Sequence, residues 1–276
     1  MLRDITIGQY YPAKSPLHRM DPRVKLIGTL VYILSLFLFE SALGYLVAGL
    51  FLFGVIKISR VPFSYIVKGL KSIVVLMMIT VIFNLFLTPG KELYSFWIFT
   101  ITIEGIVNAV FLGIRLVFLT IGASLMTFTT TPNHLTDGLE RLMNPLKKVR
   151  FPVHEIAMMM SIALRFIPIL LEETDKIMKA QMARGADFEN GNLIKKAKNL
   201  IPLLVPLFIS AFRRANDLAM AMEARCYRGG EGRTKMKPLA YKRLDAVGFL
   251  VLLCYLVVLF VVKHYLTLSF LTGVIV

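Results

Sequence analysis

The 276-residue sequence is 57% hydrophobic and carries a formal net charge of +15. This much apolar sequence excludes an ordinary soluble globular protein and indicates a polytopic membrane protein. The positive charge does not indicate a nucleic-acid-binding protein, because Lys and Arg gather beside apolar runs, where they set the orientation of membrane spans. No RNA- or DNA-binding motif accompanies them.

The first apolar runs follow a basic segment that contains prolines, residues 15–25. Two charge-free stretches come next, Leu26–Phe39 and Ser41–Ile56, separated by Glu40. One helix over both would be about 46 Å long, which exceeds a hydrocarbon core of about 30 Å. We therefore predict two short spans that turn near Glu40 and Gly44, and a re-entrant hairpin is the alternative.

Three further spans are predicted downstream. Ser72–Gly90 gives the third, Gly105–Phe128 gives the fourth, and Leu244–Val262 gives the fifth. Arg115 lies within the fourth, and an ionisable residue in a span is a functional candidate. The alternative, which we favour, is that Arg115 reaches the interface or hydrogen-bonds to carbonyls within the bundle.

The predicted fold is all-α and has three regions. Residues 1–128 hold four spans, residues 129–242 form a region of long cytoplasmic helices, and residues 243–276 hold the C-terminal transmembrane helix. Because basic segments face the cytoplasm, we predict a multi-pass protein of the cell membrane with a cytoplasmic N-terminus and an outside C-terminus.

The cytoplasmic region contains one short and two long predicted helices. The short helix begins at Thr131-Pro132 and stops at Asn144-Pro145. Pro152 precedes the first long helix, Val153–Gly185, which would extend about 48 Å to Arg184. The second, Leu193–Arg228, contains Pro202 and Pro206 and is therefore expected to bend.

Each long helix carries an Ala-Arg pair close to its C-terminal end. The first ends in Ala183-Arg184-Gly185 and the second in Ala224-Arg225-Cys226, with the arginines 41 positions apart. A guanidinium beside a small residue suits a helix tip that enters a groove on a partner protein. The alternative is that each Arg complements the negative end of the helix dipole, with Gly185 as a C-cap. Its occurrence at two helix ends favours docking.

Motifs for catalysis and metal binding are absent from the sequence. There is no G-x-x-x-x-G-K-[ST] phosphate loop, so the chain is not expected to hydrolyse ATP. The four His residues are scattered and the spans lack paired carboxylates. Methionines such as Met158–Met160 could bind soft metals, but packing is the favoured interpretation. We predict no catalytic residue, no metal site and no cofactor on this chain.

Four segments together are similar to a known family. They are Leu17–Leu26 (LHRMDPRVKL), Leu164–Pro168 (LRFIP), Ala183–Gly185 (ARG) and Ala221–Arg225 (AMEAR). On these segments the chain resembles the transmembrane coupling T component of energy-coupling factor transporters, which import vitamins and transition-metal ions, and the likeness covers nearly the whole chain.

The resemblance implies a scaffold that is not an enzyme. Ala183, Arg184 and Gly185 at one tip, and Ala224, Arg225 and Cys226 at the other, would each enter a groove on one of two ABC-type ATPases. ATP and Mg would be bound by those partners. Cys226 stands where the family usually has Gly, and would carry strain if a left-handed cap is needed there.

The resemblance also implies a membrane substrate-binding S component as a partner, alongside the lipid bilayer. We expect it to contact the apolar face of the long helices, at Met159, Ile162, Ile167, Leu204 and Phe208. Two other functional classes stay as alternatives: a membrane-embedded enzyme that uses Arg115, His134 and His154, and a channel that works alone.

Overall fold

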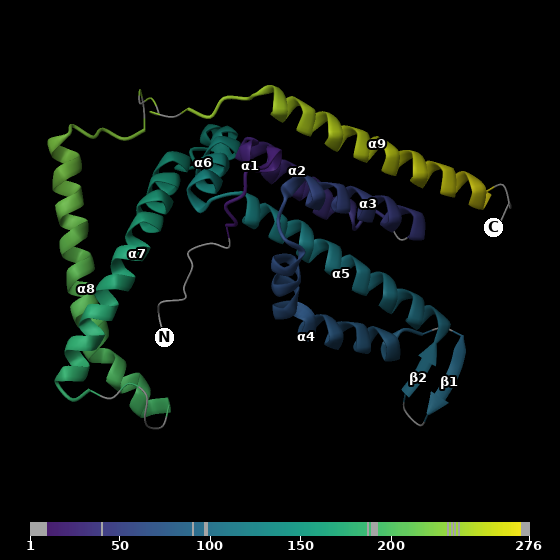
Figure 1. Ribbon diagram of the computed structural model, residues 1–276, viewed down its shortest axis with the longest axis horizontal. Helices are drawn as coiled ribbons and strands as arrows, with labels where there is room; N and C mark the ends of the chain where they lie inside the picture. Colours follow the sequence, from purple (N-terminus) through teal and green to yellow (C-terminus); the bar gives the residue numbers. More distant parts are fainter. Residues whose placement is uncertain are drawn as a thin grey trace. The chain divides into compact units, whose positions relative to one another are not determined.

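The computed structural model describes residues 10–39, 41–89, 91–96, 99–186, 188, 193–230, 232, 234, 236 and 238–271 (Figure 1). Glu40, at a predicted turn, and Gly90, the last residue of the third predicted span, lie outside these residues. The elements in chain order are α1 (Pro16–Arg19), α2 (Pro22–Ser35), α3 (Ala42–Ser59), α4 (Phe63–Leu87), β1 (Glu92–Phe96), β2 (Phe99–Thr102), α5 (Ile103–Thr129), α6 (Pro132–Met143), the 3-10 helix η1 (Asn144–Val149), α7 (Val153–Ala183), α8 (Leu193–Ala224) and α9 (Arg243–Leu271). The predicted helical fold is confirmed, with one antiparallel hairpin, β1–β2, added to it.

The described residues form two units. Those up to Leu139 and from Leu239 onward form one, which we call the bundle unit, and those from Glu140 to Pro238 form the other, the crossed-helix unit. The bundle unit therefore holds α1 to α5 and α9. The crossed-helix unit holds α7 and α8.

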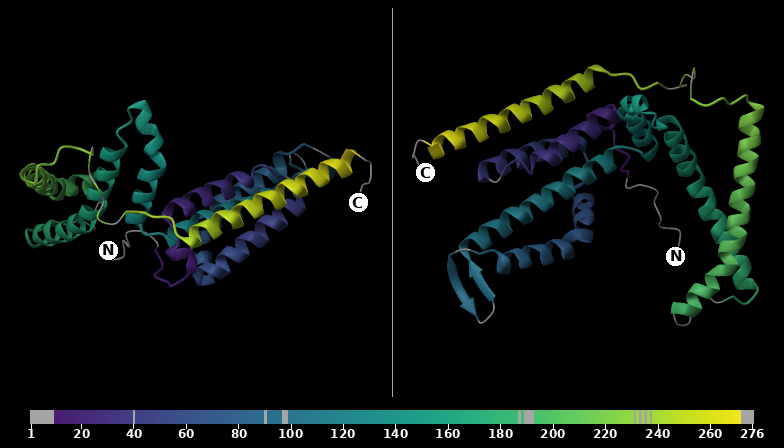
Figure 2. Two further views of the ribbon diagram at one scale, coloured as in Figure 1. Left: turned by 90° about the horizontal axis from the view of Figure 1, so that it is seen from above. Right: turned by 180° about the vertical axis from the view of Figure 1, so that it is seen from behind.

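The core of the bundle unit lies between α2, α3, α5 and α9, which run alongside one another (Figure 2). Aromatic rings hold its centre. The rings of Phe51 and Tyr255 stack with centroids 4.2 Å apart, and Tyr32 packs against both. Tyr255 also shares a 2.7 Å hydrogen bond with the Ser35 hydroxyl, so α2 and α9 are joined by polar as well as apolar contacts.

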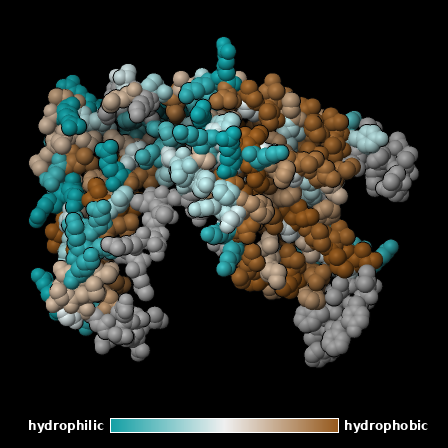
Figure 3. Space-filling view, in the orientation of Figure 1, coloured by the Kyte–Doolittle hydropathy of each residue, from teal (hydrophilic) through white to brown (hydrophobic). Residues whose placement is uncertain are grey.

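The outer surface of the bundle unit is apolar, as expected for helices that face lipid. Large hydrophobic side chains such as Leu50, Phe53 and Phe260 are exposed, and hydrophobic residues cover much of the visible face of this unit (Figure 3). Water-exposed apolar surface of this extent is rare in soluble monomers. Contact with a membrane accounts for it.

Among the described residues, four helices are long and apolar enough to cross a membrane: α3, α5, α7 and α9. The bent α4, with 60° between its two parts, would make a fifth. The predicted total of five thus agrees, but its members differ. α2 has only 14 residues, or about 21 Å, which is the length of the short span predicted over Leu26–Phe39, and it is below the length of these candidates. In contrast, α7 has the length and hydropathy of a span, which the sequence interpretation did not anticipate.

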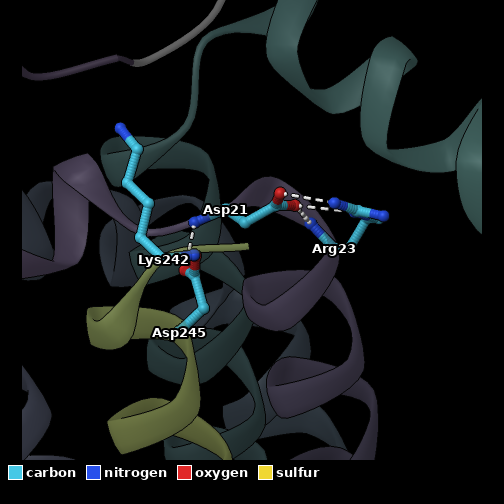
Figure 4. A network of polar contacts seen from close by, with 4 residues as sticks. All are labelled: Asp21, Arg23, Lys242 and Asp245. Atoms are coloured by element: carbon cyan, nitrogen blue, oxygen red, sulfur yellow. Dashed lines mark hydrogen bonds and ion pairs between the residues drawn. The ribbon is translucent and has the colours of Figure 1, made fainter. Parts of the chain in front are cut away.

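A buried carboxylate joins the starts of α2 and α9 within the bundle unit (Figure 4). Asp245 is 1% exposed, and accepts hydrogen bonds from the Asp21 N–H at 2.7 Å and the Lys242 N–H at 2.6 Å. Asp21 in turn caps α2 and is paired through both its oxygens with the Arg23 guanidinium. One side chain thus accepts from the N–H of the residue immediately before each of these two helices.

The electrostatic state of Asp21 reflects this pairing. Burial by itself would raise the pKa of Asp21, but the hydrogen bonds and the charge of Arg23 outweigh burial and hold the pKa below its ordinary value. The same pairing raises the pKa of Arg23. Arg23 also stacks over the Tyr241 ring, 3.9 Å from its centroid. This segment therefore anchors the chain where it leaves the crossed-helix unit and enters α9.

Candidate functional site

The C-terminal end of α7 is closed by a Schellman motif. Gly185 has φ +90° and donates its N–H to the Met182 carbonyl at 2.9 Å, while the Ala186 N–H donates to the Gln181 carbonyl at 3.0 Å. These are the two hydrogen bonds that define the motif. Glycine suits the position because it lacks the Cβ that makes positive φ unfavourable.

The C-terminal end of α8 has the same geometry with a different residue. Cys226 has φ +56°, and its N–H donates to the Glu223 carbonyl at 2.8 Å. The Tyr227 N–H donates to the Met222 carbonyl at 3.0 Å. The strain expected if the second tip used a left-handed cap therefore exists, at roughly 1–2 kcal/mol for a non-glycine residue.

Arg184 and Arg225 occupy equivalent positions, each immediately before the left-handed residue. Both side chains are exposed, as are the adjacent Ala183 and Ala224. Two carbonyls of each last turn, those of Gln181 and Met182 and those of Met222 and Glu223, are already bonded by backbone N–H groups, so neither arginine is needed to cap these. The favourable effect of a cation at a helix C-terminus remains, at about 0.3–1 kcal/mol, and it does not require the side chain to be held against the helix.

α7 and α8 pack together in antiparallel fashion (Figure 1). Gln181 near the end of α7 contacts Pro202 in the first half of α8, whereas Glu173, earlier in α7, contacts Ser210 and Arg214. Positions earlier in α7 therefore contact positions later in α8, as in an antiparallel pair. The two Arg-bearing tips consequently lie on opposite sides of the contact.

The bend predicted in α8 is linked to α7 by a specific hydrogen bond. Pro202 and Pro206 both lie inside α8. Pro206 has no N–H, so the Pro202 carbonyl lacks its usual partner four residues later. The Gln181 amide donates to that carbonyl at 3.4 Å. This contact ties the last turn of α7, which carries the Arg184 tip, to the proline region of α8.

The loop after the second tip is packed against the start of α7. Gly230 lies so close to the His154 ring that an added Cβ would be 2.5 Å from its Cδ2 atom. The His154 Nδ1 atom lies 3.2 Å from a Glu140 oxygen. Sequence reasoning considered His154 only as part of an alternative enzyme site. The sequence signal for this close approach of the loop to the His154 ring was Gly230, a glycine five residues after Arg225.

The residues expected to contact a substrate subunit lie mostly on exposed surface of α7 and α8. Met159 is 57% exposed and Phe208 is 61% exposed, Ile167 and Leu204 are also exposed, and Ile162 is half-buried. On α8 the neighbouring Val205 and Phe212 are exposed as well. An apolar stripe at this helical spacing is typical of a helix face that docks on a membrane or a partner.

Arg115 is held within the bundle unit. Its Nε donates to the Tyr45 hydroxyl at 2.8 Å and its guanidinium lies 3.5 Å from the Phe39 carbonyl. The guanidinium also lies over the rings of Phe37 and Tyr45. The favoured interpretation, that this arginine is satisfied by groups of the bundle, is thereby confirmed.

Known proteins are similar to this chain over most of its length. The chain matches the family described as cobalt transport protein (CbiQ) over residues 13–236. A protein of Clostridium kluyveri named energy-coupling factor transporter transmembrane protein EcfT is 56% identical over 259 residues, covering 93% of this chain and 95% of that protein. Proteins with the same name from Acidaminococcus fermentans and Bacillus subtilis are 52% and 47% identical, covering 94% and 95% of this chain and 97% and 100% of their own lengths. The resemblance based on sequence motifs is confirmed, and the chain belongs to the EcfT/CbiQ family of energy-coupling factor transporter transmembrane proteins.

Proposed function

We propose that this chain, a transmembrane component of an energy-coupling factor transporter, transmits ATP-driven motion from two ABC-type ATPases to a membrane substrate-binding subunit. The chain itself is non-catalytic, and ATP and Mg are bound by the ATPases. The transported substrate is a vitamin or a transition-metal ion bound by the substrate subunit.

The observation that carries the proposal is the matching pair of helix ends. Each presents an exposed arginine beside an alanine, on a backbone closed by the same two hydrogen bonds. A cap of this kind fixes the direction of the last turn, and the small alanine permits close approach to a groove wall. Arginine offers a planar fork for carboxylates or carbonyls inside such a groove.

The two tips would serve two ATPases because they lie on opposite sides of the contact between α7 and α8. When the ATPases close on ATP, Arg184 and Arg225 are drawn toward each other. The long helices then carry that displacement to the membrane side. There the apolar stripe, which includes Met159 and Phe208, holds the substrate subunit, and the membrane-like hydropathy of α7 suits such a buried face.

Orientation in the membrane follows from the same assignment. The ATPases are cytoplasmic, so the tips face the cytoplasm, together with the N-terminus. The C-terminus then lies outside if the five crossings are α2, α3, α4, α5 and α9, with α7 on the cytoplasmic side. Cysteine-accessibility labelling in a background without native cysteines tests this. We expect Lys91→Cys to be labelled from outside and Met182→Cys only from inside, and labelling of Met182→Cys from outside overturns the orientation.

Substitution of the tip arginines tests the coupling role. Losing one partner of a charged contact desolvated in a groove typically costs about 2–5 kcal/mol, and Glu adds repulsion from the groove carboxylates. We expect Arg184→Glu and Arg225→Glu each to abolish uptake of the compound that copurifies with the substrate subunit, in liposomes with all subunits present. The double variant should also lose the ATPases in pull-downs. Near-normal uptake by both single variants contradicts the proposal.

A second pair of variants tests which face holds which partner. Met159→Asp and Leu204→Asp place charge on the apolar stripe, so they should release the substrate subunit while the ATPases stay bound. Loss of the ATPases with retention of the substrate subunit would show that the two partners are assigned to the wrong faces. Turnover of a substrate, or solute flux, by the purified chain alone would favour the enzyme or the channel instead.

A further inference from the structure

One polar cluster lies where α7 and α8 cross. The Glu173 carboxylate accepts a hydrogen bond from the Ser210 hydroxyl at 3.0 Å through one oxygen and is paired with the Arg214 guanidinium through the other. The Glu173 side chain is 26% exposed and that of Arg214 is 38% exposed. The Nε atom of Arg214 is buried and has no hydrogen-bond partner within the part of the chain that the structure describes. The cluster is thus partly withdrawn from water and directional.

The cluster lies midway between the two arginine tips. Arg184 follows Glu173 by eleven residues on α7, and Arg225 follows Arg214 by eleven residues on α8. The spacing of the ion pair along the chain, 41 residues, is therefore also the spacing of the two tips. At a rise of 1.5 Å per residue, each tip is about 16 Å beyond the cluster, in opposite directions.

We propose that Glu173, Ser210 and Arg214 are positioning residues that fix the angle at which α7 and α8 cross, and through it the separation of Arg184 and Arg225. This inference rests on the proposed function of the tips. Apolar contacts between two packed helices are non-directional, so by themselves they allow one helix to rotate over the other. Hydrogen bonds to both oxygens of one carboxylate are directional, so they oppose such a rotation.

A small change in the crossing angle of α7 and α8 moves each tip appreciably, because the tip lies far from the cluster. A rotation of about 10° at the cluster moves a tip that is about 16 Å away by roughly 3 Å. That is enough to take a guanidinium out of hydrogen-bonding range of a groove residue. Two tips that must enter two grooves at once therefore need a defined crossing angle, and this cluster supplies it.

Distance measurement between the tips tests the proposal on the full-length purified chain. Cys226 and Cys254, the two native cysteines, are replaced by Ser, and spin labels are attached at Met182→Cys and Met220→Cys, both exposed near the tips. Pulsed electron paramagnetic resonance then gives the distribution of label separations. No ATPase is needed, so the result does not depend on whether the tips bind one.

We expect Glu173→Gln and Arg214→Gln each to broaden this distribution, because the crossing angle is then no longer fixed by the ion pair. Ser210→Ala should broaden it less, because the ion pair stays. The exchange of charges, Glu173→Arg with Arg214→Glu, should restore a narrow distribution. Matched controls are Glu172→Gln and Arg213→Gln, which remove the same charges from exposed neighbouring positions and should leave the distribution unchanged.

An unchanged distribution in both Glu173→Gln and Arg214→Gln overturns the inference, whether or not the thermal stability of the chain falls. Equal broadening by the two control variants also overturns it, since net charge would then be responsible. Failure of the coupling function gives a different result: Arg184→Glu and Arg225→Glu would leave uptake normal, while the label distances still responded to the central ion pair.

Discussion

Replacement of Cys226 by Gly should stabilise the second arginine tip. The residue has φ +56°, which costs a side-chain-bearing residue roughly 1–2 kcal/mol. Glycine avoids this cost but loses more backbone entropy on folding, about 0.5–1 kcal/mol. The net gain is therefore about 0.5–1 kcal/mol. The reverse change, Gly185→Ala, should cost the first tip a similar amount, because an added Cβ there meets nothing within 4 Å and the backbone conformation alone opposes it.

Hydrogen exchange followed by mass spectrometry measures this locally. The Cys226 and Tyr227 N–H groups make the two capping hydrogen bonds, so peptides that contain them report the opening of the tip. A change of 0.5–1 kcal/mol corresponds to about 2–5-fold slower exchange in Cys226→Gly. Cys226→Ser is the matched control, because it removes the thiol but keeps the Cβ and hence the strain. If exchange is no slower in Cys226→Gly than in Cys226→Ser, the strain argument is refuted.

Three further changes test other parts of the structure by thermal unfolding of the purified chain. Gly230→Ala forces a Cβ to within 2.5 Å of the His154 ring, and should destabilise by about 1–3 kcal/mol. Asp245→Asn replaces one of the two buried oxygens that accept from backbone N–H groups by an NH2 group, and should also cost about 1–3 kcal/mol. The pKa of Asp21 is lower in the folded chain than its ordinary value of 3.8. The stabilising contribution of Asp21 is therefore complete above that pH and is lost as the pH falls below it. Arg23→Gln should reduce this loss of stability in acid, because it removes the partner that lowers the pKa.

Each of these changes has a control in the same chain. Gly54→Ala adds a Cβ that meets nothing within 4 Å inside a helix, and should be neutral or stabilising. Asp217→Asn and Arg19→Gln neutralise exposed side chains and should have little effect. If Gly230→Ala or Asp245→Asn is no more destabilising than its control, the contact in question contributes nothing measurable. An acid response of Arg23→Gln that equals the unsubstituted chain would contradict the pairing argument.

Local signals in the sequence predicted the long helices well. Pro152 precedes α7 and Thr131-Pro132 begins α6, as expected, because proline fits the first turn of a helix and the Thr131 hydroxyl accepts from the His134 N–H. The ends at Arg184 and Arg225 were also predicted, within a few residues. Capping preferences depend on residues close in sequence, so they can be read without knowledge of the tertiary structure.

Features that depend on tertiary structure were not predictable in this way. No proline marks the 60° bend of α4, and the helix α2 ends at Ser35 although apolar residues continue to Phe39. The hairpin β1–β2 lies in a stretch rich in aromatic and β-branched residues, which favour strands, but it was treated as a connection between spans. The pairing of Glu173 with Arg214 has no local signature, because other acidic and basic residues flank both.

The two arginine tips are alike in their caps but unlike in their support. Between Arg214 and Arg225, α8 contains no proline, so the part of α8 that carries the second tip is an uninterrupted helix. On the other side, Arg184 ends α7 next to the proline region of α8, where the carbonyl left free by Pro206 is bonded by Gln181. A proline bend alone would be a place for α8 to flex. Because Gln181 belongs to the last turn before Arg184, displacement of that tip acts directly on the proline region of α8. Displacement of Arg225 reaches it only through the crossing, so the two tips are mechanically unequal despite their matching backbone geometry.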